Sequence, residues 1–376
     1  MIFKKYGLVL AGGGGKGAYQ IGAWKALREM RISFDAIAGV SIGSINGALI
    51  AAGDMNKAIE FWHNVSVKKG IRIENELVDP ENLFSKKNWS ILFKEFLKNG
   101  GFDASPAADY IKTYVDEDKV RKKKIPLGIV TVHLSQSATP LEIFVEDIPQ
   151  GELVDYLLAS SNIPLATNIG PEGERFLDGG VYDNTPVMTL KKRGFNKLIV
   201  IDISNIKGVA HNLNFNNSQV VYIRPYDLDD LGQSFDFSGP MIDRRIRLGY
   251  LDTRKAFGHL SGNIYYFTPE VFSQMVEQYG ANAIYELEEL AHKLKVEKIT
   301  VYGKDEFISA VKIALEESKA GEEAAAAEEP AAEKPADGTF DWSDIKEKWN
   351  QLRGRGQRKD LEEFAEAIAV LDSVVM

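Results

Sequence analysis

The sequence contains no cysteine and only five histidines in 376 residues. Without cysteine, the protein has no disulfide framework, no thiolate metal site and no cysteine nucleophile. It also lacks an uninterrupted apolar run long enough to cross a bilayer as a helix, and no apolar core with a cleavage site follows the first residues. We therefore expect a cytoplasmic protein whose membrane contact, if it makes any, is peripheral at the inner membrane face.

Basic residues are not in excess, because the formal net charge is -9. A nucleic-acid-binding protein usually carries a basic footprint, so we expect no nucleic-acid partner. Hydrophobic residues make up 44% of the chain and charged residues 26%, which is typical of a folded globular protein. A chain of this length can bury a large core without disulfides.

The beginning of the chain alternates strand-like and helix-like segments. Residues 7–11 and 34–40 are short apolar runs that end in small residues, as buried strands do. Residues 17–30 carry apolar side chains at helical spacing, and residues 42–52 are small and apolar. This order favours a mainly parallel sheet with helical crossovers. Further strands are expected at 125–133, 141–145, 197–203 and 219–223, and further helices at 151–161, 241–259, 285–295 and 305–318.

Composition divides the chain into three parts. We assign residues 1–315 to one catalytic domain, with core blocks in residues 6–203 and a candidate cap insertion at 57–124. Residues 316–339 are rich in alanine and glutamate and have too little apolar area to pack, which predicts a linker. Residues 340–376 predict a helical tail with two amphipathic helices around a basic stretch.

Two features of the insertion bear on membrane contact. Residues 88–99 place aromatic and aliphatic side chains on one helical face with lysines opposite, which is the composition of an interfacial helix. A cap that touches lipid and a helix packed in the core both fit this pattern. Residues 121–124, with the sequence Arg-Lys-Lys-Lys, fit either contact with anionic headgroups or a solvated loop before a strand.

A serine lies at the turn after the second expected strand. Gly39-Val40-Ser41-Ile42-Gly43 matches G-x-S-x-G. A nucleophile elbow needs this local structure, because the serine must occupy a sharp turn and glycines let the backbone pack closely. The N-terminus of the next helix would favour a developing alkoxide. The pattern alone also fits an ordinary turn with Ser41 as the helix cap.

A glycine run lies at the turn after the first expected strand. It reads Gly12-Gly13-Gly14-Gly15-Lys16-Gly17. Its exposed backbone N–H groups could hold a phosphate or the oxyanion of an acyl intermediate. The run satisfies G-x-G-x-x-G, but a dinucleotide site needs an acidic residue at the end of the second strand, and Asp35 opens that strand. The run does not match a Walker loop either, because Lys16 is followed by Gly17 and not by serine or threonine. An oxyanion hole is favoured, and nucleotide binding remains the weaker alternative.

The serine needs a base, and histidine is the first expectation. His133 is the best placed of the histidines, because it ends an expected strand. Asp178 is a better candidate, because a strand-like segment delivers it to Gly179 and Gly180, and these glycines allow another group to approach the carboxylate. An aspartate followed by glycine also fits a simple turn.

Three blocks in this order resemble the signature blocks of patatin-like phospholipases. They are Gly12-Gly13-Gly14-Gly15-Lys16-Gly17, Gly39-Val40-Ser41-Ile42-Gly43 and Asp178-Gly179-Gly180. Residues 159–164 before the aspartate and 181–186 after it are similar as well. The sequence departs from the family at Gly15, where alanine is frequent, and at Asn162, where a small residue is usual. Neither departure touches the serine or the aspartate.

The resemblance implies a three-layer α/β/α patatin-like fold with a mainly parallel central sheet. It implies a lipid ester hydrolase of phospholipase A, lysophospholipase or esterase type, with a catalytic dyad of Ser41 and Asp178, a lipid or phospholipid substrate, no metal and no cofactor. An acyltransferase that uses the same acyl-enzyme is the alternative within this class. The oxyanion hole falls on Gly12, Gly13, Gly14 and Gly15, supported by Lys16, Gly17, Gly39, Gly43, Gly179 and Gly180. Asp183 and Asn184 either order the loop of the aspartate or are plain turn residues.

Overall fold

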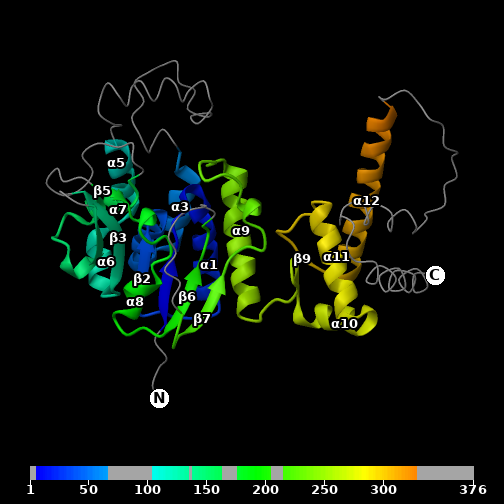
Figure 1. Ribbon diagram of the computed structural model, residues 1–376, viewed down its shortest axis with the longest axis horizontal. Coiled ribbons are helices and arrows are strands. Elements are labelled where there is room, and N and C mark those ends of the chain that lie inside the picture. Colours follow the sequence, from blue (N-terminus) through cyan, green and yellow to red (C-terminus); the bar gives the residue numbers. More distant parts are fainter. Residues whose placement is uncertain (1–5, 67–103, 135–137, 163–175, 205–214, 328–376) are drawn as a thin grey trace. The chain divides into compact units, whose positions relative to one another are not determined.

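The computed structural model describes residues 6–66, 104–134, 138–162, 176–204 and 215–327 (Figure 1). Contacts within the chain divide it after Phe257 into two compact units. The first unit contains every motif singled out in the sequence. The second unit is a smaller, mainly helical body with a core of its own.

The first unit is built on a seven-stranded sheet. The strand order is β4-β3-β2-β1-β6-β7, and β5 pairs with β3 outside this path. The parallel strands are β1 (Gly7–Leu10), β2 (Ala36–Val40), β3 (Leu127–Leu134), β6 (Lys197–Ile201) and β7 (Gln219–Ile223), whereas β4 (Ala138–Phe144) and β5 (Phe176–Asp178) run antiparallel to β3. The predicted mainly parallel sheet is confirmed.

The strand register brings the ends of β1 and β2 to the same edge of the sheet. Leu10 lies opposite both Gly39 and Ile201, so the segments after these strands begin at one level. β1 and β2 are buried along their whole length, as apolar runs inside a parallel sheet are. The carboxyl edge of such a sheet is where open α/β folds bind their ligands.

Helices cover both faces of the sheet (Figure 1). On one face lies α2 (Ile42–Ala52), where a Cβ added to Gly47 would be 2.8 Å from Leu127 and 3.3 Å from Ile37. On the other lies α8 (Val187–Lys191), whose Leu190 shares a core cluster with Val9. The further helices described in this unit are α1 (Ala18–Glu29), α3 (Met55–Asn64), α5 (Ser105–Tyr114), α6 (Glu117–Lys123), α7 (Leu153–Ser160) and α9 (Gly239–Ala256). The expected three-layer α/β/α fold is therefore confirmed.

The second unit packs three helices around an aromatic core. They are α10 (Pro269–Tyr279), α11 (Ala281–Lys293) and α12 (Lys304–Ala327), joined by the short parallel pair β8 (Tyr266–Phe267) and β9 (Val301–Tyr302). Tyr265, Phe267 and Phe307 are completely buried in this core. The carboxylate of Glu288, also completely buried, accepts hydrogen bonds from the backbone amides of Asn263, Ile264 and Tyr265, which compensates its removal from water.

The observed boundaries differ from the predicted ones. The division after Phe257 precedes residue 315, because the segment beyond it builds a separate core. α12 continues to Ala327, so the first part of the predicted linker is helical. Alanine and glutamate are good helix formers, which explains this difference. Residues 328–376 and the expected interfacial helix at 88–99 lie outside the described residues. Within the described ranges, no helix is both long and apolar enough to span a bilayer.

Glycines allow α1 and α9 to touch backbone to backbone. A Cβ added to Gly22 would lie 1.8 Å from the carbonyl oxygen of Ile246, and one added to Gly249 would lie 1.9 Å from that of Tyr19. Side chains at these two positions would hold the helices apart, because interiors are close-packed. This contact brings α9, which lies far along the sequence, beside the segment that follows β1.

We predict that Gly249→Ala lowers the free energy of unfolding by about 1–3 kcal/mol, the usual cost of overpacking. The added methyl group would collide with the carbonyl of Tyr19. Gly239→Ala in the same helix is the matched control, since a Cβ there would meet nothing within 4 Å. Denaturant unfolding of both variants measures the difference. Equal stability of Gly249→Ala and the wild type would contradict the close approach.

Candidate active site

Ser41 occupies the predicted turn between a strand and a helix. β2 ends at Val40 and α2 begins at Ile42, and Ser41 between them has φ 53° and ψ -131°. A positive φ is strained for a residue with a side chain. The flanking glycines are required by space, because a Cβ on Gly39 would lie 2.3 Å from the carbonyl oxygen of Gly43. The turn therefore has the geometry of a nucleophile elbow.

Hydrogen bonds on both sides hold the backbone of Ser41. Its amide donates to Ser160 Oγ at 2.9 Å, and this hydroxyl donates to the carbonyl of Val130 at 2.6 Å. The carbonyl of Ser41 accepts from the amide of Ser44 at 2.9 Å and from Ser44 Oγ at 2.7 Å. Ser160 is the last residue of α7 and lies in the segment whose resemblance to the family was noted from sequence. The strained turn is thus fixed by β3, α2 and α7 together.

Asp178 ends β5, which places it next to the serine. In the strand pairing it lies opposite Thr131 of β3, and its amide donates to the carbonyl of Asn162 at 2.8 Å. Its carboxylate accepts the amide hydrogen of Gly180 at 2.7 Å. The two residues selected separately from the sequence are therefore both held at residues 130–131 of β3.

Burial raises the pKa of the Asp178 carboxyl above its ordinary value of 3.8. Hydrogen bonds from Ser41 and Gly180 favour the charged form and oppose this shift. The residue as a whole retains some exposure, while its carboxyl group has dense surroundings that solvate charge poorly. A carboxylate with a raised pKa accepts protons more readily at neutral pH.

The glycine loop lies beside Ser41, and its four candidate donors are not equivalent. A Cβ on Gly12 would lie 3.2 Å from Ser41 Cβ. The amide of Gly12 already donates to the carbonyl of Asn184 at 3.2 Å, and that of Gly15 to the carbonyl of Ser234 at 2.6 Å. Within the part of the chain that the structure describes, the amides of Gly13 and Gly14 donate no hydrogen bond. Of the four glycines expected to form the oxyanion hole, Gly13 and Gly14 are therefore the two whose amides have no partner among the described residues.

A network of buried side chains from α1, α2 and α3 holds the glycine loop by hydrogen bonds. Gln20 Nε2 donates to the carbonyl of Ala11 at 2.7 Å. Asn46 Nδ2 donates to the carbonyl of Gly17 at 2.9 Å and to Gln20 Oε1 at 2.8 Å. Trp62 Nε1 completes the network by donating to Asn46 Oδ1 at 3.0 Å. Sequence reasoning missed these side chains, because single polar residues inside apolar helices carry no motif.

Asn184 connects the glycine loop with the loop of the aspartate. Its Nδ2 lies 3.4 Å from the carbonyl oxygen of Gly12, and a Cβ on Gly180 would lie 2.7 Å from its Oδ1. Asp183 is buried and its Oδ1 accepts the amide hydrogen of Thr185 at 3.1 Å. The sequence left two interpretations of Asp183 and Asn184 open, and these contacts agree with the one in which they order the loop of Asp178.

The remaining predicted support residues are close-packed or buried. A Cβ on Gly43 would lie 2.3 Å from the carbonyl oxygen of Leu10, and one on Gly179 would lie 2.1 Å from that of Val130. A Cβ on Gly17 would lie 2.7 Å from Ile42. Lys16 is buried, and burial lowers the pKa of its amino group, with the charge of Arg245 acting in the same direction.

His133, the histidine singled out from the sequence, lies in β3 and faces a different partner. It pairs with Phe176 across the strands, and the two rings have centroids 5.0 Å apart. Among the described residues, no group of three or more histidine, aspartate or glutamate side chains is arranged to hold a metal ion.

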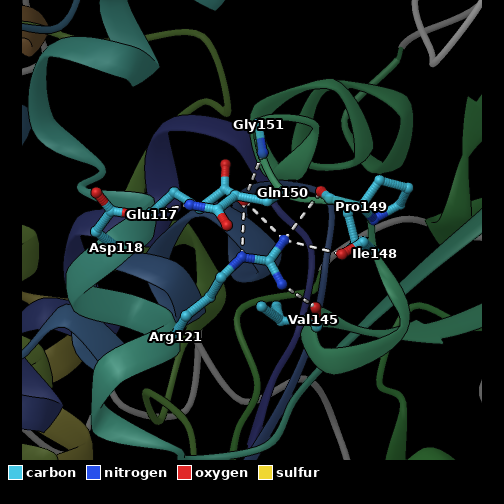
Figure 2. Close-up of polar contacts among 8 residues, drawn as sticks. All are labelled: Glu117, Asp118, Arg121, Val145, Ile148, Pro149, Gln150 and Gly151. Atoms are coloured by element: carbon cyan, nitrogen blue, oxygen red, sulfur yellow. Dashed lines mark hydrogen bonds and ion pairs between the residues drawn. The ribbon is translucent and has the colours of Figure 1, made fainter.

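Arg121 anchors the connection that leads into α7 (Figure 2). Its guanidinium donates to the carbonyls of Val145 at 2.8 Å, Ile148 at 2.9 Å and Pro149 at 3.0 Å. Its Nη2 also lies 2.7 Å from Glu117 Oε1. From the sequence, Arg121 is expected in a basic segment that either contacts anionic headgroups or forms a solvated loop. This side chain instead bridges α6 to the segment before α7.

The fold and these contacts define an α/β domain with a serine at a nucleophile elbow. Residues 8–191 match the family model described as patatin-like phospholipase. Residues 8–191 of the chain therefore form a patatin-like phospholipase domain.

Curated relatives carry lysophospholipase names. Lysophospholipase NTE1 of Cryptococcus neoformans var. neoformans serotype D is 27% identical over 54% of this chain and 11% of its own length. Lysophospholipase nte1 of Aspergillus terreus is 30% identical over 54% of this chain and 12% of its own length. The chain thus matches only about a tenth of the relatives' length. Among solved structures, VipD from Legionella pneumophila is 12% identical with a TM-score of 0.43, covering 99% of this chain and 79% of VipD.

We predict that Asp178→Asn raises the melting temperature at neutral pH. Because the folded-state pKa is raised, the folded protein binds this proton more tightly than the unfolded chain, so ionisation of Asp178 lowers stability as pH rises through the folded-state pKa. Replacing the carboxyl group by a neutral side-chain amide removes this loss of stability. The gain is expected to shrink as pH falls toward 3.8, the ordinary carboxyl value.

Thermal unfolding at several pH values measures this effect. Asp116→Asn is the control of opposite sign, because the hydrogen bond from the Lys119 amide lowers the pKa of the Asp116 carboxyl. That variant should gain no stability at neutral pH. A lower melting temperature for Asp178→Asn than for the wild type at neutral pH would contradict the raised pKa.

Proposed function

We propose that this chain is a serine acyl hydrolase that cleaves carboxylic esters of lipids, as a phospholipase A, lysophospholipase or esterase. The observation that carries the proposal is the position of Asp178 at the end of β5, opposite Thr131, while Ser160 joins Ser41 to the neighbouring Val130 of β3. Ser41 and Asp178 lie beside a loop in which the amides of Gly13 and Gly14 make no other hydrogen bond among the described residues. A nucleophile, a base and oxyanion donors are the groups that acyl transfer requires.

The reaction would proceed in two steps through an acyl-enzyme. Ser41 Oγ bonds to the ester carbonyl carbon while its proton passes to Asp178, and the carbonyl oxygen becomes an oxyanion. The tetrahedral intermediate then breaks its bond to the alcohol, which leaves with the proton from Asp178. Water attacks the acyl-enzyme, gives a proton to Asp178 and releases the acid, and that proton returns to Ser41. With an alcohol in place of this water, the same acyl-enzyme would perform acyl transfer.

The oxyanion would be stabilised by the amides of Gly13 and Gly14. Both residues are partly exposed, whereas Gly12 and Gly15 are buried, which agrees with a role at the surface of the loop. Losing one oxyanion donor costs about 2.7–4 kcal/mol of transition-state stabilisation in other enzymes. Two such donors would offset a large part of the cost of using an aspartate as the base.

Exposed apolar side chains support a lipid substrate. In the described part of the first unit, the large hydrophobic side chains that are most exposed are Val181, Tyr182, Tyr226 and Phe235. They lie in the segment after Asp178, in the segment after β7 and in the loop that contains Ser234. Apolar side chains around a site suit contact with a lipid aggregate. We accordingly propose a cytoplasmic enzyme that binds peripherally to the inner membrane face.

The dyad makes a direct prediction for activity. Ser41→Ala and Asp178→Asn are each expected to lower kcat by at least about a thousandfold, because each removes a group that acts in bond making. Turnover of short- and long-chain p-nitrophenyl esters and of a phospholipid measures this. Labelling by a fluorophosphonate should modify the wild type once per chain and should be absent in Ser41→Ala.

Ser218→Ala, at a half-buried serine whose Oγ lies 3.5 Å from the carbonyl oxygen of Asn216, is the matched control and should retain wild-type turnover. Full activity in Asp178→Asn would assign the base to another residue, with His133 tested next. Absence of both turnover and labelling in the wild type would contradict the proposed function.

The four exposed apolar side chains Val181, Tyr182, Tyr226 and Phe235, called the apolar rim, predict an effect that depends on the substrate. Val181→Asp is expected to reduce turnover of phosphatidylcholine vesicles several-fold, because a charge at the rim opposes contact with an apolar surface. Turnover of a soluble short-chain ester should be unchanged. Ile313→Asp is the matched control, because Ile313 in the second unit is also 54% exposed. Equal vesicle activity in the two variants would contradict a role for the rim.

A further inference from the structure

A buried arginine holds the glycine loop from the side of α9. Arg245 lies in the middle of this helix and is completely buried. Its Nε donates to the carbonyl of Leu231 at 2.7 Å, and its Nη2 to that of Gln233 at 2.7 Å. Its Nη1 donates to the carbonyl of Gly15 at 3.1 Å and to that of Asp236. One guanidinium thus joins the glycine loop to residues 231–236.

The same two segments are joined a second time through the backbone. The amide of Gly15 donates to the carbonyl of Ser234 at 2.6 Å, so both polar backbone groups of Gly15 are held. Space is equally limited, because a Cβ on Gly15 would lie 2.9 Å from that carbonyl oxygen and 3.1 Å from Arg245 Nη1. A Cβ on Gly14 would lie 2.7 Å from the Ser234 oxygen. The loop therefore rests on residues 231–236 with little freedom to move.

A run of glycines needs such a support if it is to act as an oxyanion hole. Glycine has more accessible backbone conformations than any other residue, and Gly14 adopts a positive φ of 58°. An oxyanion hole is effective only when its N–H groups already point at the oxyanion. Fixing both backbone groups of Gly15 restricts the adjoining Gly14, whose amide is one of the two candidate donors.

The chemistry of Arg245 suits a fixed support. Arginine presents several donors in a rigid planar fork, which can hold several carbonyls in one arrangement. Burial lowers the pKa of Arg245 to about 10, so the guanidinium remains protonated at neutral pH and keeps all its donors. A lysine would retain the charge but could not hold the four carbonyls in the same plane.

We propose that Arg245 is a positioning residue for acyl transfer, which fixes the glycine loop in the conformation that turns the Gly13 and Gly14 amides toward the oxyanion. It acts through Gly15 and residues 231–236 and does not touch the substrate. The inference rests on the proposed function of the site. Arg245 lies outside residues 8–191, the segment that matches the family model.

Arg245→Lys in the full chain tests the proposal. We expect kcat for a soluble ester to fall about 10- to 100-fold while KM stays within about twofold, because the loss falls on oxyanion stabilisation. The affinity for a trifluoromethyl ketone, which forms a tetrahedral oxyanion with the serine, should fall in proportion to kcat/KM. Arg244→Lys is the control, because Arg244 holds the backbone carbonyl and the carboxylate of Asp230, next to residues 231–236. It should retain the wild-type values.

Amide hydrogen exchange separates this proposal from the proposed function, because it needs no turnover. Peptides that contain residues 13–16 should exchange faster in Arg245→Lys than in the wild type and in Arg244→Lys. If the wild type hydrolyses no ester, the proposed function fails, and exchange still reports whether Arg245 orders the loop. If Arg245→Lys does not fold, the same measurements are made on Arg245→Met. A folded variant with unchanged kcat and unchanged exchange would overturn the proposal, as would an equal loss of kcat in Arg244→Lys.

Discussion

Close backbone contact between the turns after β1 and β2 is the constraint on which the site depends. A Cβ on Gly43 would lie 2.3 Å from the carbonyl oxygen of Leu10, and one on Gly12 would lie 3.2 Å from Ser41 Cβ. Only residues without a side chain allow two chain segments to approach in this way. The register that sets Leu10 opposite Gly39 starts both turns at the same level. Backbone shape and strand register therefore bring the serine and the glycine loop together.

The electrostatics of the site follow from the same close packing. Burial raises the pKa of Asp178 and lowers those of Lys16 and Arg245, so all three shifts favour the neutral form. Such shifts mean that the surroundings solvate charge poorly. Hydrogen bonds and peptide dipoles act more strongly in such surroundings than in water. The packing that raises the pKa of Asp178 thus also strengthens the hydrogen bonds that hold the glycine loop.

The local parts of this arrangement could be predicted from the sequence, and the long-range parts could not. Apolar runs that end in glycine predicted β1 and β2 with their turns, because strand burial and turn geometry are local properties. The contacts of Asn46 and Arg245 depend on segments far apart in the chain, and no local pattern marks them. The helical start of the predicted linker could not be foreseen for a related reason, because composition does not distinguish a linker from a helix rich in alanine and glutamate.

The buried contacts of the site and the exposed apolar side chains differ in how much change they tolerate. The groups that would act on the ester are held by buried contacts: Ser41 by Ser160, and the glycine loop by Asn46 and Arg245. Val181, which follows the Asp178-Gly179-Gly180 segment, is by contrast an exposed apolar side chain. Buried contacts tolerate little change, since each lost partner leaves a polar group unsatisfied, whereas exposed side chains can change without such a cost. Substitutions of exposed apolar side chains such as Val181 are therefore expected to cost less stability than the loss of these buried contacts.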